Sequence, residues 1–114
     1  MRKTAIALLL TLAAVAHAAQ PETVMVTYRP KKGSEAQLAQ VVAKHWDTAR
    51  RLELVTSDPR HVYRAGSLLI EVFTWKDAEI PDHAPAEIRA IWDELNTLVE
   101  KNGISILEVE RVPE

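Results

Sequence analysis

One carboxylate in this sequence is a candidate for chemistry because of where it lies. Glu71 sits in the middle of an almost entirely apolar stretch, residues 68–75. If this carboxylate is buried, desolvation raises its pKa, and Glu71 could then act as a catalytic base. The alternative is an ion pair, either across strands with an arginine such as Arg29 or Arg64, or across a dimer interface. Glu71 is therefore a candidate catalytic residue with a structural role as its competitor.

A second candidate catalytic residue is His83, which follows Asp82 in a polar loop bounded by prolines. A histidine titrates near neutral pH, so it could transfer protons, hold haem or contact a substrate. It could equally be a solvated residue at the beginning of a helix. Another histidine, His45, is expected to point toward solvent. No HxH or HExxH spacing occurs, so the four histidines predict no metal site.

Aromatic side chains provide candidates for ligand binding. A cavity lined by such rings could hold an apolar or aromatic molecule, and the candidates are Trp75, Trp92, Tyr28 and Trp46. The hydroxyl of Tyr28 could donate a hydrogen bond to a ligand, although half-buried strand tyrosines also do this without function. Trp92 and Trp46 lie on the apolar faces of predicted helices, so packing in the core is the competing interpretation for both.

Composition excludes several classes of function. The chain has 114 residues, enough for one domain, and a net charge of −2, which argues against nucleic-acid binding. It contains no cysteine, which excludes disulfides, thiolate metal sites and a cysteine nucleophile. No GxSxG motif is present, and glycines only at positions 33, 66 and 103 cannot form a phosphate-binding loop.

Residues 1–18 have the three-part pattern of a secretory signal peptide. Arg2 and Lys3 precede an apolar run over 5–15, and small residues stand three and one before a cut after Ala18. The run is far shorter than the ~20 residues that span a bilayer, although an uncleaved anchor helix is the alternative. We therefore expect export across the inner membrane into a periplasm, with residues 19–114 forming a single mature domain that is not bound to the membrane.

The remaining chain is divided into clear segments by its glycines and prolines. Alternating or apolar β-rich runs predict strands, and apolar residues repeating every three or four positions predict helices. The strands are expected at 23–29, 60–65, 67–75 and 104–112, with a short extended piece at 52–56, and the helices at 35–51 and from Pro85 to Asn102-Gly103. This order is β-α-β-β-α-β, an α+β fold of the ferredoxin-like type, in which right-handed crossovers place both helices on one face of a four-stranded antiparallel sheet.

Both faces of that sheet are expected to be largely apolar. Strand 67–75 carries Leu68, Ile70 and Val72 on one side, and on the other side Glu71 is the one charge among apolar residues. Two helices can cover only one face, and soluble monomers rarely leave an apolar face in water. The sequence therefore predicts a homodimer that forms sheet against sheet.

With this order of elements, the sequence resembles the antibiotic biosynthesis monooxygenase (ABM) superfamily, the dimeric α/β-barrel proteins, over about residues 23–112. Besides topology, the resemblance rests on a strand that ends in Trp75 (EVFTWKD), on His83 at the mouth of the second helix, and on Trp92 within that helix. Trp75 matches the strand Trp of the haem-degrading members, whereas Tyr28 stands close to where those proteins carry an Asn.

The resemblance implies three alternatives for function. In the first, the protein binds a small apolar or aromatic molecule between sheet and helices and, if catalytic, oxidises it with oxygen and no tightly bound cofactor. In the second, the protein is a non-catalytic dimeric module for binding or structural support. In the third, the protein binds haem, with His83 aimed into a porphyrin-sized cavity.

Overall fold

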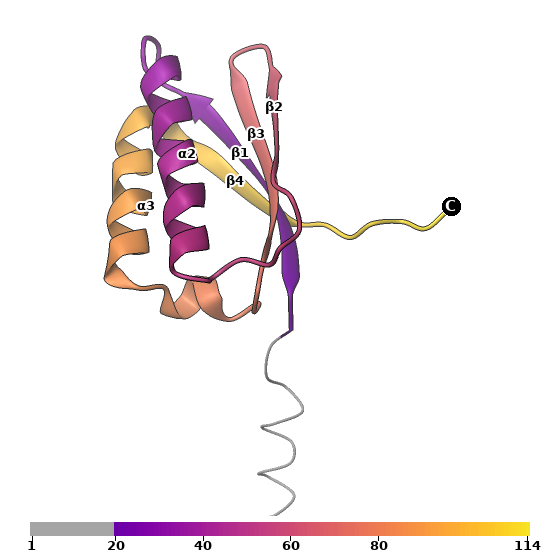
Figure 1. Ribbon diagram of the computed structural model, residues 1–114. Coiled ribbons are helices and arrows are strands. Elements are labelled where there is room, and N and C mark those ends of the chain that lie inside the picture. Colours follow the sequence, from indigo (N-terminus) through magenta and orange to yellow (C-terminus); the bar gives the residue numbers. More distant parts are fainter. Residues whose placement is uncertain (1–19) are drawn as a thin grey trace, which may run out of the picture.

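The computed structural model describes residues 20–114, and the predicted signal peptide lies outside the described residues. The elements are β1 (Glu22–Pro30), α2 (Glu35–Arg51), β2 (His61–Ala65), β3 (Leu68–Trp75), the 3₁₀ helix η1 (Ile80–His83), α3 (Ala86–Leu98) and β4 (Val99–Glu108). Figure 1 labels the four strands and the two α-helices. The predicted β-α-β-β-α-β order is confirmed, and η1 is an addition within the loop between β3 and α3. No helix within residues 20–114 combines the length and the apolar character needed to cross a membrane.

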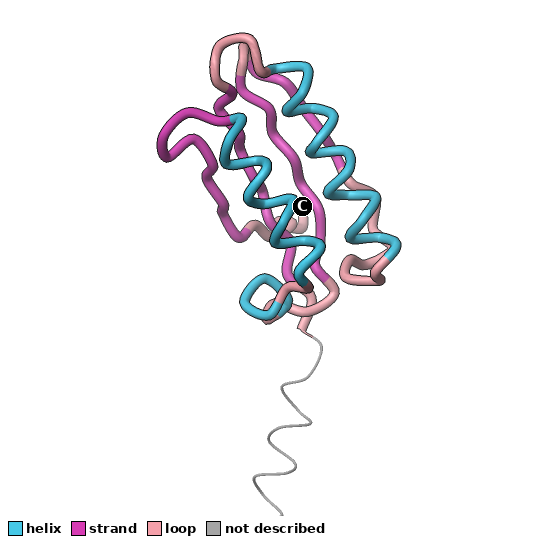
Figure 2. Tube along the Cα trace, turned by 90° about the vertical axis from the view of Figure 1, so that its left-hand side faces the viewer, coloured by secondary structure: helices cyan, strands magenta, loops and turns pink. Residues whose placement is uncertain are grey.

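The four strands form one antiparallel sheet in the order β2-β3-β1-β4. Figures 1 and 2 show α2 and α3 side by side on the same face of this sheet. The ferredoxin-like fold is therefore confirmed. Its register places Val26 of β1 opposite Glu71 of β3, and Tyr28 opposite Leu69. Tyr28 and Glu71 are consequently diagonal neighbours on one face of the sheet, close enough for their long side chains to meet.

The apolar stripe of α2 explains how this helix packs on the sheet. The buried positions follow helical spacing and include Leu38, Val41, Val42, His45 and Ala49. His45 comes four residues after Val41 and three after Val42, so it faces the sheet with them. The expectation that His45 points toward solvent is therefore wrong, because helical geometry outweighs the polarity of the side chain.

The end of α3 differs from the prediction. The helix stops at Leu98, and Val99 already has extended backbone angles and begins β4. Asn102 does adopt a left-handed conformation, with φ of 56°, but it lies within a bulge of β4 and not at a helix end. The Asn102-Gly103 signal was therefore read for the wrong element, since a left-handed residue serves a bulge as well as a helix cap.

The bulge also makes a glycine necessary. Pairing between β1 and β4 shifts from Pro30 opposite Val99 to Tyr28 opposite Ile104, so β4 accommodates extra residues at this point. A Cβ atom on Gly103 would lie only 2.6 Å from the backbone oxygen of Glu100. The strand predicted at 104–112 consequently begins earlier than expected, and it ends at Glu108.

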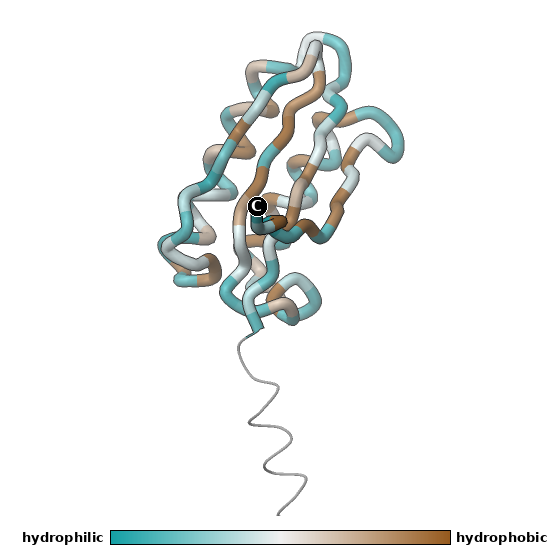
Figure 3. The backbone as a smooth tube through the Cα atoms, turned by 90° about the vertical axis from the view of Figure 1, so that its right-hand side faces the viewer, coloured by the Kyte–Doolittle hydropathy of each residue, from teal (hydrophilic) through white to brown (hydrophobic). Residues whose placement is uncertain are grey.

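The two faces of the sheet have different surroundings. The inner face packs against α2 and α3, whereas neither helix covers the other side, which we call the open face. Figure 3 views the sheet from its open side and shows apolar residues along the strands. Its larger side chains are Met25, Thr27, His61, Tyr63, Leu68, Ile70, Val72 and Leu107. No Lys, Arg, Asp or Glu occupies its paired positions from 23 to 27, 61 to 65, 68 to 74 or 105 to 107.

Candidate functional site

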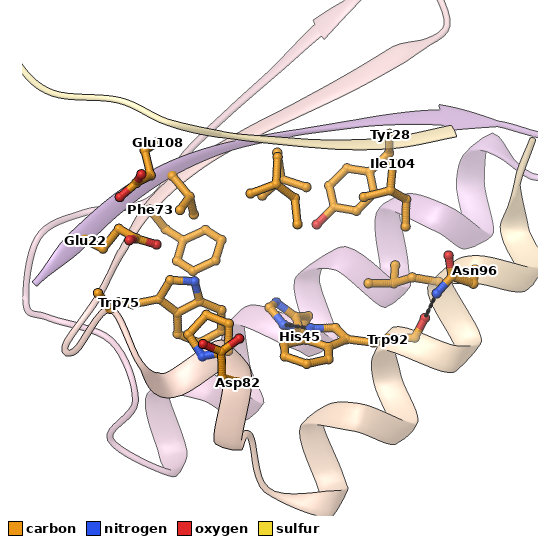
Figure 4. A pocket seen from close by; sticks show the side chains of 16 residues that line it. Glu22, Tyr28, His45, Phe73, Trp75, Asp82, Trp92, Asn96, Ile104 and Glu108 are labelled. Atoms are coloured by element: carbon orange, nitrogen blue, oxygen red, sulfur yellow. Dashed lines mark hydrogen bonds between the residues drawn. The ribbon is translucent and has the colours of Figure 1, made fainter. Parts of the chain in front are cut away.

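A cavity of about 590 Å³ lies between the inner face of the sheet and the two helices. Figure 4 shows the strands on one side of it and the helices on the other. Its apolar wall comes mainly from β1, β3, β4 and α3 and includes Val24, Val26, Phe73, Trp75, Trp92, Leu95, Ile104 and Ile106. Such a wall suits a small apolar or aromatic molecule.

The cavity exists because large and small side chains are unevenly distributed on the inner face. Phe73 and Trp75 of β3 pack edge to face with ring centres 4.9 Å apart and fill the space beneath their own strand. On the neighbouring strand β1, two successive inward side chains, Val24 and Val26, are much shorter. The space under β1 and β4 is therefore left open toward α3.

Three of the predicted ligand-binding residues line this cavity. Trp75 and Tyr28 are buried on the sheet side, and Trp92 is partly buried on α3. The fourth, Trp46, is absent from the cavity wall; its ring packs against Phe73 at 6.0 Å and lies under the guanidinium of Arg60 at 5.7 Å. Trp46 thus serves the packing of α2, the competing interpretation given above.

His83 lies apart from the cavity. It ends η1, is exposed and makes no part of the cavity wall, although its neighbour Asp82 does. Because the side chain is solvated, the structure gives it no partner through which to act on a molecule in the cavity. Across residues 20–114 there is no cluster of three or more His, Asp or Glu side chains that could hold a metal ion.

His45 occupies the inner wall of the cavity. Only 3% of this residue is exposed, and its Nε2 accepts a hydrogen bond of 2.9 Å from the indole Nε1–H of Trp92. Burial, and secondarily the positive charge of Arg60, lower the pKa of His45 to about 4. The imidazole is therefore neutral at neutral pH, and its free lone pair is already used.

Glu71 is fully buried, with 0% of its surface exposed, yet both carboxylate oxygens have partners. Tyr28 donates its hydroxyl proton to Oε1 at 2.9 Å, and Arg60 donates to Oε2 at 3.2 Å. Burial raises the pKa of Glu71, and these two hydrogen bonds and the Arg60 charge oppose that rise. The arrangement combines the two interpretations of the sequence: a buried carboxylate with a raised pKa, and an ion pair.

The arginine partner differs from those named in advance. Arg60 lies just before β2, two residues from Val62, which pairs with Glu71. It therefore reaches Glu71 diagonally, whereas Arg64 stands opposite Leu69 and Arg29 approaches Glu100 at 3.9 Å. The prediction of Arg29 or Arg64 is wrong, because the register of β2 against β3, which strand alternation does not fix, brings Arg60 to Glu71.

Carboxylates gather at one end of the cavity, where Figure 4 shows Glu22, Asp82 and Glu108 near Trp75. A hydrogen bond with Glu108, then burial and the charge of Glu108, raise the pKa of Glu22. No Lys or Arg is among the residues that line the cavity. The electrostatic potential at this end is therefore negative and not offset by a cation in the wall.

Sequence reasoning missed His45, Phe73 and Arg60 as parts of this site. The signal for His45 was present, because it repeats the spacing of the buried valines of α2. Phe73 was recognisable as an inner-face neighbour of Trp75, two residues away on the same strand. Nothing in the local sequence marks Arg60, since its role depends on the pairing of β2 with β3.

Comparison with solved structures identifies the fold. The chain resembles Rv0793 from Mycobacterium tuberculosis with a TM-score of 0.67 and 12% identity, covering 83% of this chain and 98% of that one. Because solved structures of antibiotic biosynthesis monooxygenases also match the chain, the chain has the ABM fold. It also resembles SnoaB, a cofactor-independent oxygenase from Streptomyces nogalater (TM-score 0.62, 14% identity, 84% of this chain and 100% of that one covered).

A putative antibiotic biosynthesis monooxygenase from Nitrosomonas europaea has a TM-score of 0.65 at 6% identity, with 82% of this chain and 92% of that one covered. At such low identities the likeness establishes the fold and leaves the chemistry of the cavity to its own residues. No protein-family model matches the sequence, and no curated protein sequence matches it significantly.

Proposed function

We propose that this protein binds a small aromatic molecule in its cavity and oxidises it with dioxygen, without a tightly bound cofactor. The observation that supports this most directly is the cavity of about 590 Å³, walled by aromatic and aliphatic side chains of an ABM fold. Apolar walls bury a flat ring system, while a few polar groups fix its orientation. The chemistry then depends on a substrate that is itself easily oxidised.

Tyr28 and Glu71 provide the proton acceptor that such a reaction requires. When the oxygen of Tyr28 takes a proton from the substrate, Tyr28 passes its own hydroxyl proton to Oε1 of Glu71, 2.9 Å away. The raised pKa of Glu71 favours this uptake. Arg60 holds the other carboxylate oxygen in place at 3.2 Å.

The overall reaction balances with dioxygen alone. A substrate with an acidic CH₂ group between aromatic rings loses a proton, and its carbanion gives one electron to O₂. The two radicals combine into a peroxide, which takes up the proton and loses water to leave a ketone: R₂CH₂ + O₂ → R₂C=O + H₂O. The protein contributes orientation, a site that excludes bulk water, and the proton acceptor.

Haem fits this cavity poorly. His83, the axial ligand that haem binding would need, is exposed outside it. His45 does face the cavity, but its Nε2 already accepts the Trp92 hydrogen bond. The propionates of haem would meet carboxylates at the cavity end, with no Lys or Arg in the wall. We therefore derive no chemistry through haem.

Isothermal titration with an anthrone as probe tests binding. Incorporation of ¹⁸O from ¹⁸O₂ into the ketone tests oxidation. A matched pair of variants distinguishes the cavity from the surface. Ile104→Phe fills the cavity and should weaken binding about tenfold, whereas Val62→Phe enlarges an exposed residue outside the cavity wall and should change little. Binding without turnover would favour the non-catalytic alternative, and equal binding by both variants would contradict the proposed site.

We also infer that a second copy of the chain covers the open face. This face lacks charged side chains at its paired positions, and its edges expose Tyr63 and Leu107, each 56% accessible. Burying such a face against itself in a two-fold dimer removes apolar surface from water without leaving a charge unpaired. The oligomeric state of the protein in solution tests this inference, and a monomer at micromolar concentration would contradict it.

Export to the periplasm remains a proposal that rests on residues 1–18. The basic start, apolar run and small residues before Ala19 support it. The mass of the protein isolated from the periplasmic fraction is the test: a chain that begins at Ala19 supports the proposal, and a full-length chain in the membrane fraction contradicts it.

A further inference from the structure

The hydrogen bonds around Tyr28 point to the chemical class of the ligand, an inference that rests on the proposed function of the cavity. We propose that the cavity selects neutral hydroxyaromatic molecules, whose hydroxyl group donates a hydrogen bond to the Oη atom of Tyr28, and disfavours aromatic acids. Tyr28 would thus be a specificity-determining residue.

The first step of the argument concerns the proton of Tyr28. Figure 4 shows this residue on the strand side of the cavity, across from His45 and Trp92. Its single hydroxyl proton is donated to Glu71 over 2.9 Å. A phenol has one donor and further acceptor capacity, so toward a ligand the oxygen of Tyr28 can only accept. Burial also raises the pKa of Tyr28 well above its ordinary value, which keeps the hydroxyl protonated.

The second step concerns why the hydroxyl of Tyr28 keeps donating to Glu71 and not into the cavity. Glu71 is fully buried, and Arg60 donates to its second oxygen at 3.2 Å, so the carboxylate accepts at both ends. A hydrogen bond donated to a carboxylate polarises the donor hydroxyl and strengthens its oxygen as an acceptor for the next donor. Tyr28 is therefore held as an acceptor, which is complementary to a ligand hydroxyl and repels an anionic oxygen.

The third step concerns the charge of the rest of the wall. The carboxylates of Glu22, Asp82 and Glu108 line the cavity, and no Lys or Arg does. An aromatic carboxylate entering this cavity would lose hydration and gain no cationic partner. A neutral phenol loses little hydration by comparison and brings the donor that Tyr28 lacks. The same preference thus follows from hydrogen bonding and from charge.

Three ligands of one ring system test the proposal: 2-naphthol, its isostere 2-methylnaphthalene, and 2-naphthoate. Their dissociation constants are measured by isothermal titration on the intact protein at pH 7. We expect 2-naphthol to bind at least about tenfold more tightly than 2-naphthoate. The preference for 2-naphthol over 2-methylnaphthalene is then compared between variants, so that differences in hydrophobicity between the ligands cancel.

Two tyrosine variants form a matched pair for this comparison. Tyr28→Phe removes the acceptor and should reduce the preference for 2-naphthol over 2-methylnaphthalene about five- to tenfold, the equivalent of one hydrogen bond. Tyr63→Phe alters an exposed tyrosine outside the cavity wall and should leave the preference unchanged. An unchanged preference in Tyr28→Phe would overturn the inference.

A second variant tests the direction of the hydrogen bond without removing it. In Glu71→Gln, Arg60 still needs the side-chain oxygen, so the amide NH₂ faces Tyr28 and donates to it. The hydroxyl of Tyr28 is then free to donate into the cavity. We expect 2-naphthoate to gain affinity relative to 2-naphthol by about tenfold in this variant; no change in that ratio would overturn the inference.

The outcomes separate this inference from the function on which it rests. Failure of all three ligands to bind would overturn the proposed function together with the inference. Binding of 2-naphthoate as tight as that of 2-naphthol would overturn the inference alone, since the cavity would still be a site for aromatic molecules.

Discussion

The two faces of strand β3 differ in what shields their side chains from water. On the inner face, Glu71 is buried as a charge, and residues of the same chain supply a partner for each of its oxygens. On the open face, Ile70 and Val72 bring no charge, and neither α2 nor α3 covers them. The inner face is therefore complete within one chain, whereas the open face is the one that the proposed second copy would cover.

The largest effect is expected from a charge placed on the open face. Ile70→Glu would place two carboxylates without partners in the proposed dimer interface, at a cost of about 4 kcal/mol or more, because unpaired charges resist burial. Sedimentation at micromolar concentration should then show monomers. Gln40→Glu, which adds the same charge at an exposed position of α2 away from the open face, is the control. If the unmodified protein is itself a monomer, the comparison of the two faces fails.

The next effect is expected from the inner face. Arg60→Ala leaves the buried carboxylate of Glu71 with Tyr28 as its remaining partner and should lower the free energy of unfolding by about 3 kcal/mol. Arg60→Ala combined with Glu71→Leu should recover most of that loss, since no charge is then left buried. Urea unfolding measures both variants; an equal loss in the two would mean that Arg60 acts through packing on Trp46.

A smaller effect concerns pH. The pKa of His45 is lowered to about 4 in the folded chain, below its ordinary value of 6.5. The unfolded chain therefore binds the proton first, and stability is lost as the pH falls from 6.5 toward 4. Between pH 7 and pH 5 this amounts to about 2 kcal/mol.

His45→Gln isolates that effect, because its amide oxygen can still accept from Trp92 and does not titrate. The raised pKa of Glu71 acts in the opposite direction and is common to both proteins. Urea unfolding at the two pH values should show a smaller acid loss in the variant. A loss of equal size would show that His45 is not the group responsible.

The smallest effect is expected at Trp92. Trp92→Phe keeps a ring in the cavity wall but removes the indole donor to His45, at a cost of about 1 kcal/mol. His45 should then titrate at a higher pH, since its lone pair becomes free. NMR titration of the imidazole measures the change; an unaltered pKa would mean that burial alone controls it.

The sequence predicted the fold well, because the fold depends on local patterns. Strand alternation at 67–75 and the helical repeat after Ser34 reappear as β3 and α2. Alternation alone separated the side of β3 that carries Glu71 from the uncharged side with Ile70 and Val72, but it did not show which side the helices cover. At Asn102-Gly103 a left-handed residue suits both a helix cap and a β-bulge, and the prediction wrongly chose the helix cap.

The candidate site was less predictable, because it depends on contacts between distant segments. The wall formed by Trp75, Trp92 and Tyr28 was anticipated, but the pairing of His45 with Trp92 joins residues that are 47 positions apart. The partner of Glu71 depends on the register of β2 against β3, which alternation does not fix. His83 was favoured by family resemblance and lies in solvent, since position in a motif does not determine orientation.

The direct passage from α3 into β4 limits how a ligand can enter. Leu98 ends the helix and Val99 begins the strand, so no linker separates the helical wall of the cavity from its strand wall at that end. A hinge there is disfavoured, because the backbone oxygen of Leu98 accepts a hydrogen bond of 2.9 Å from the backbone N–H of Lys31. A ligand is therefore expected to enter at the opposite end of the cavity. The proline-bounded segment 76–85 and the carboxylate of Glu22 border that end.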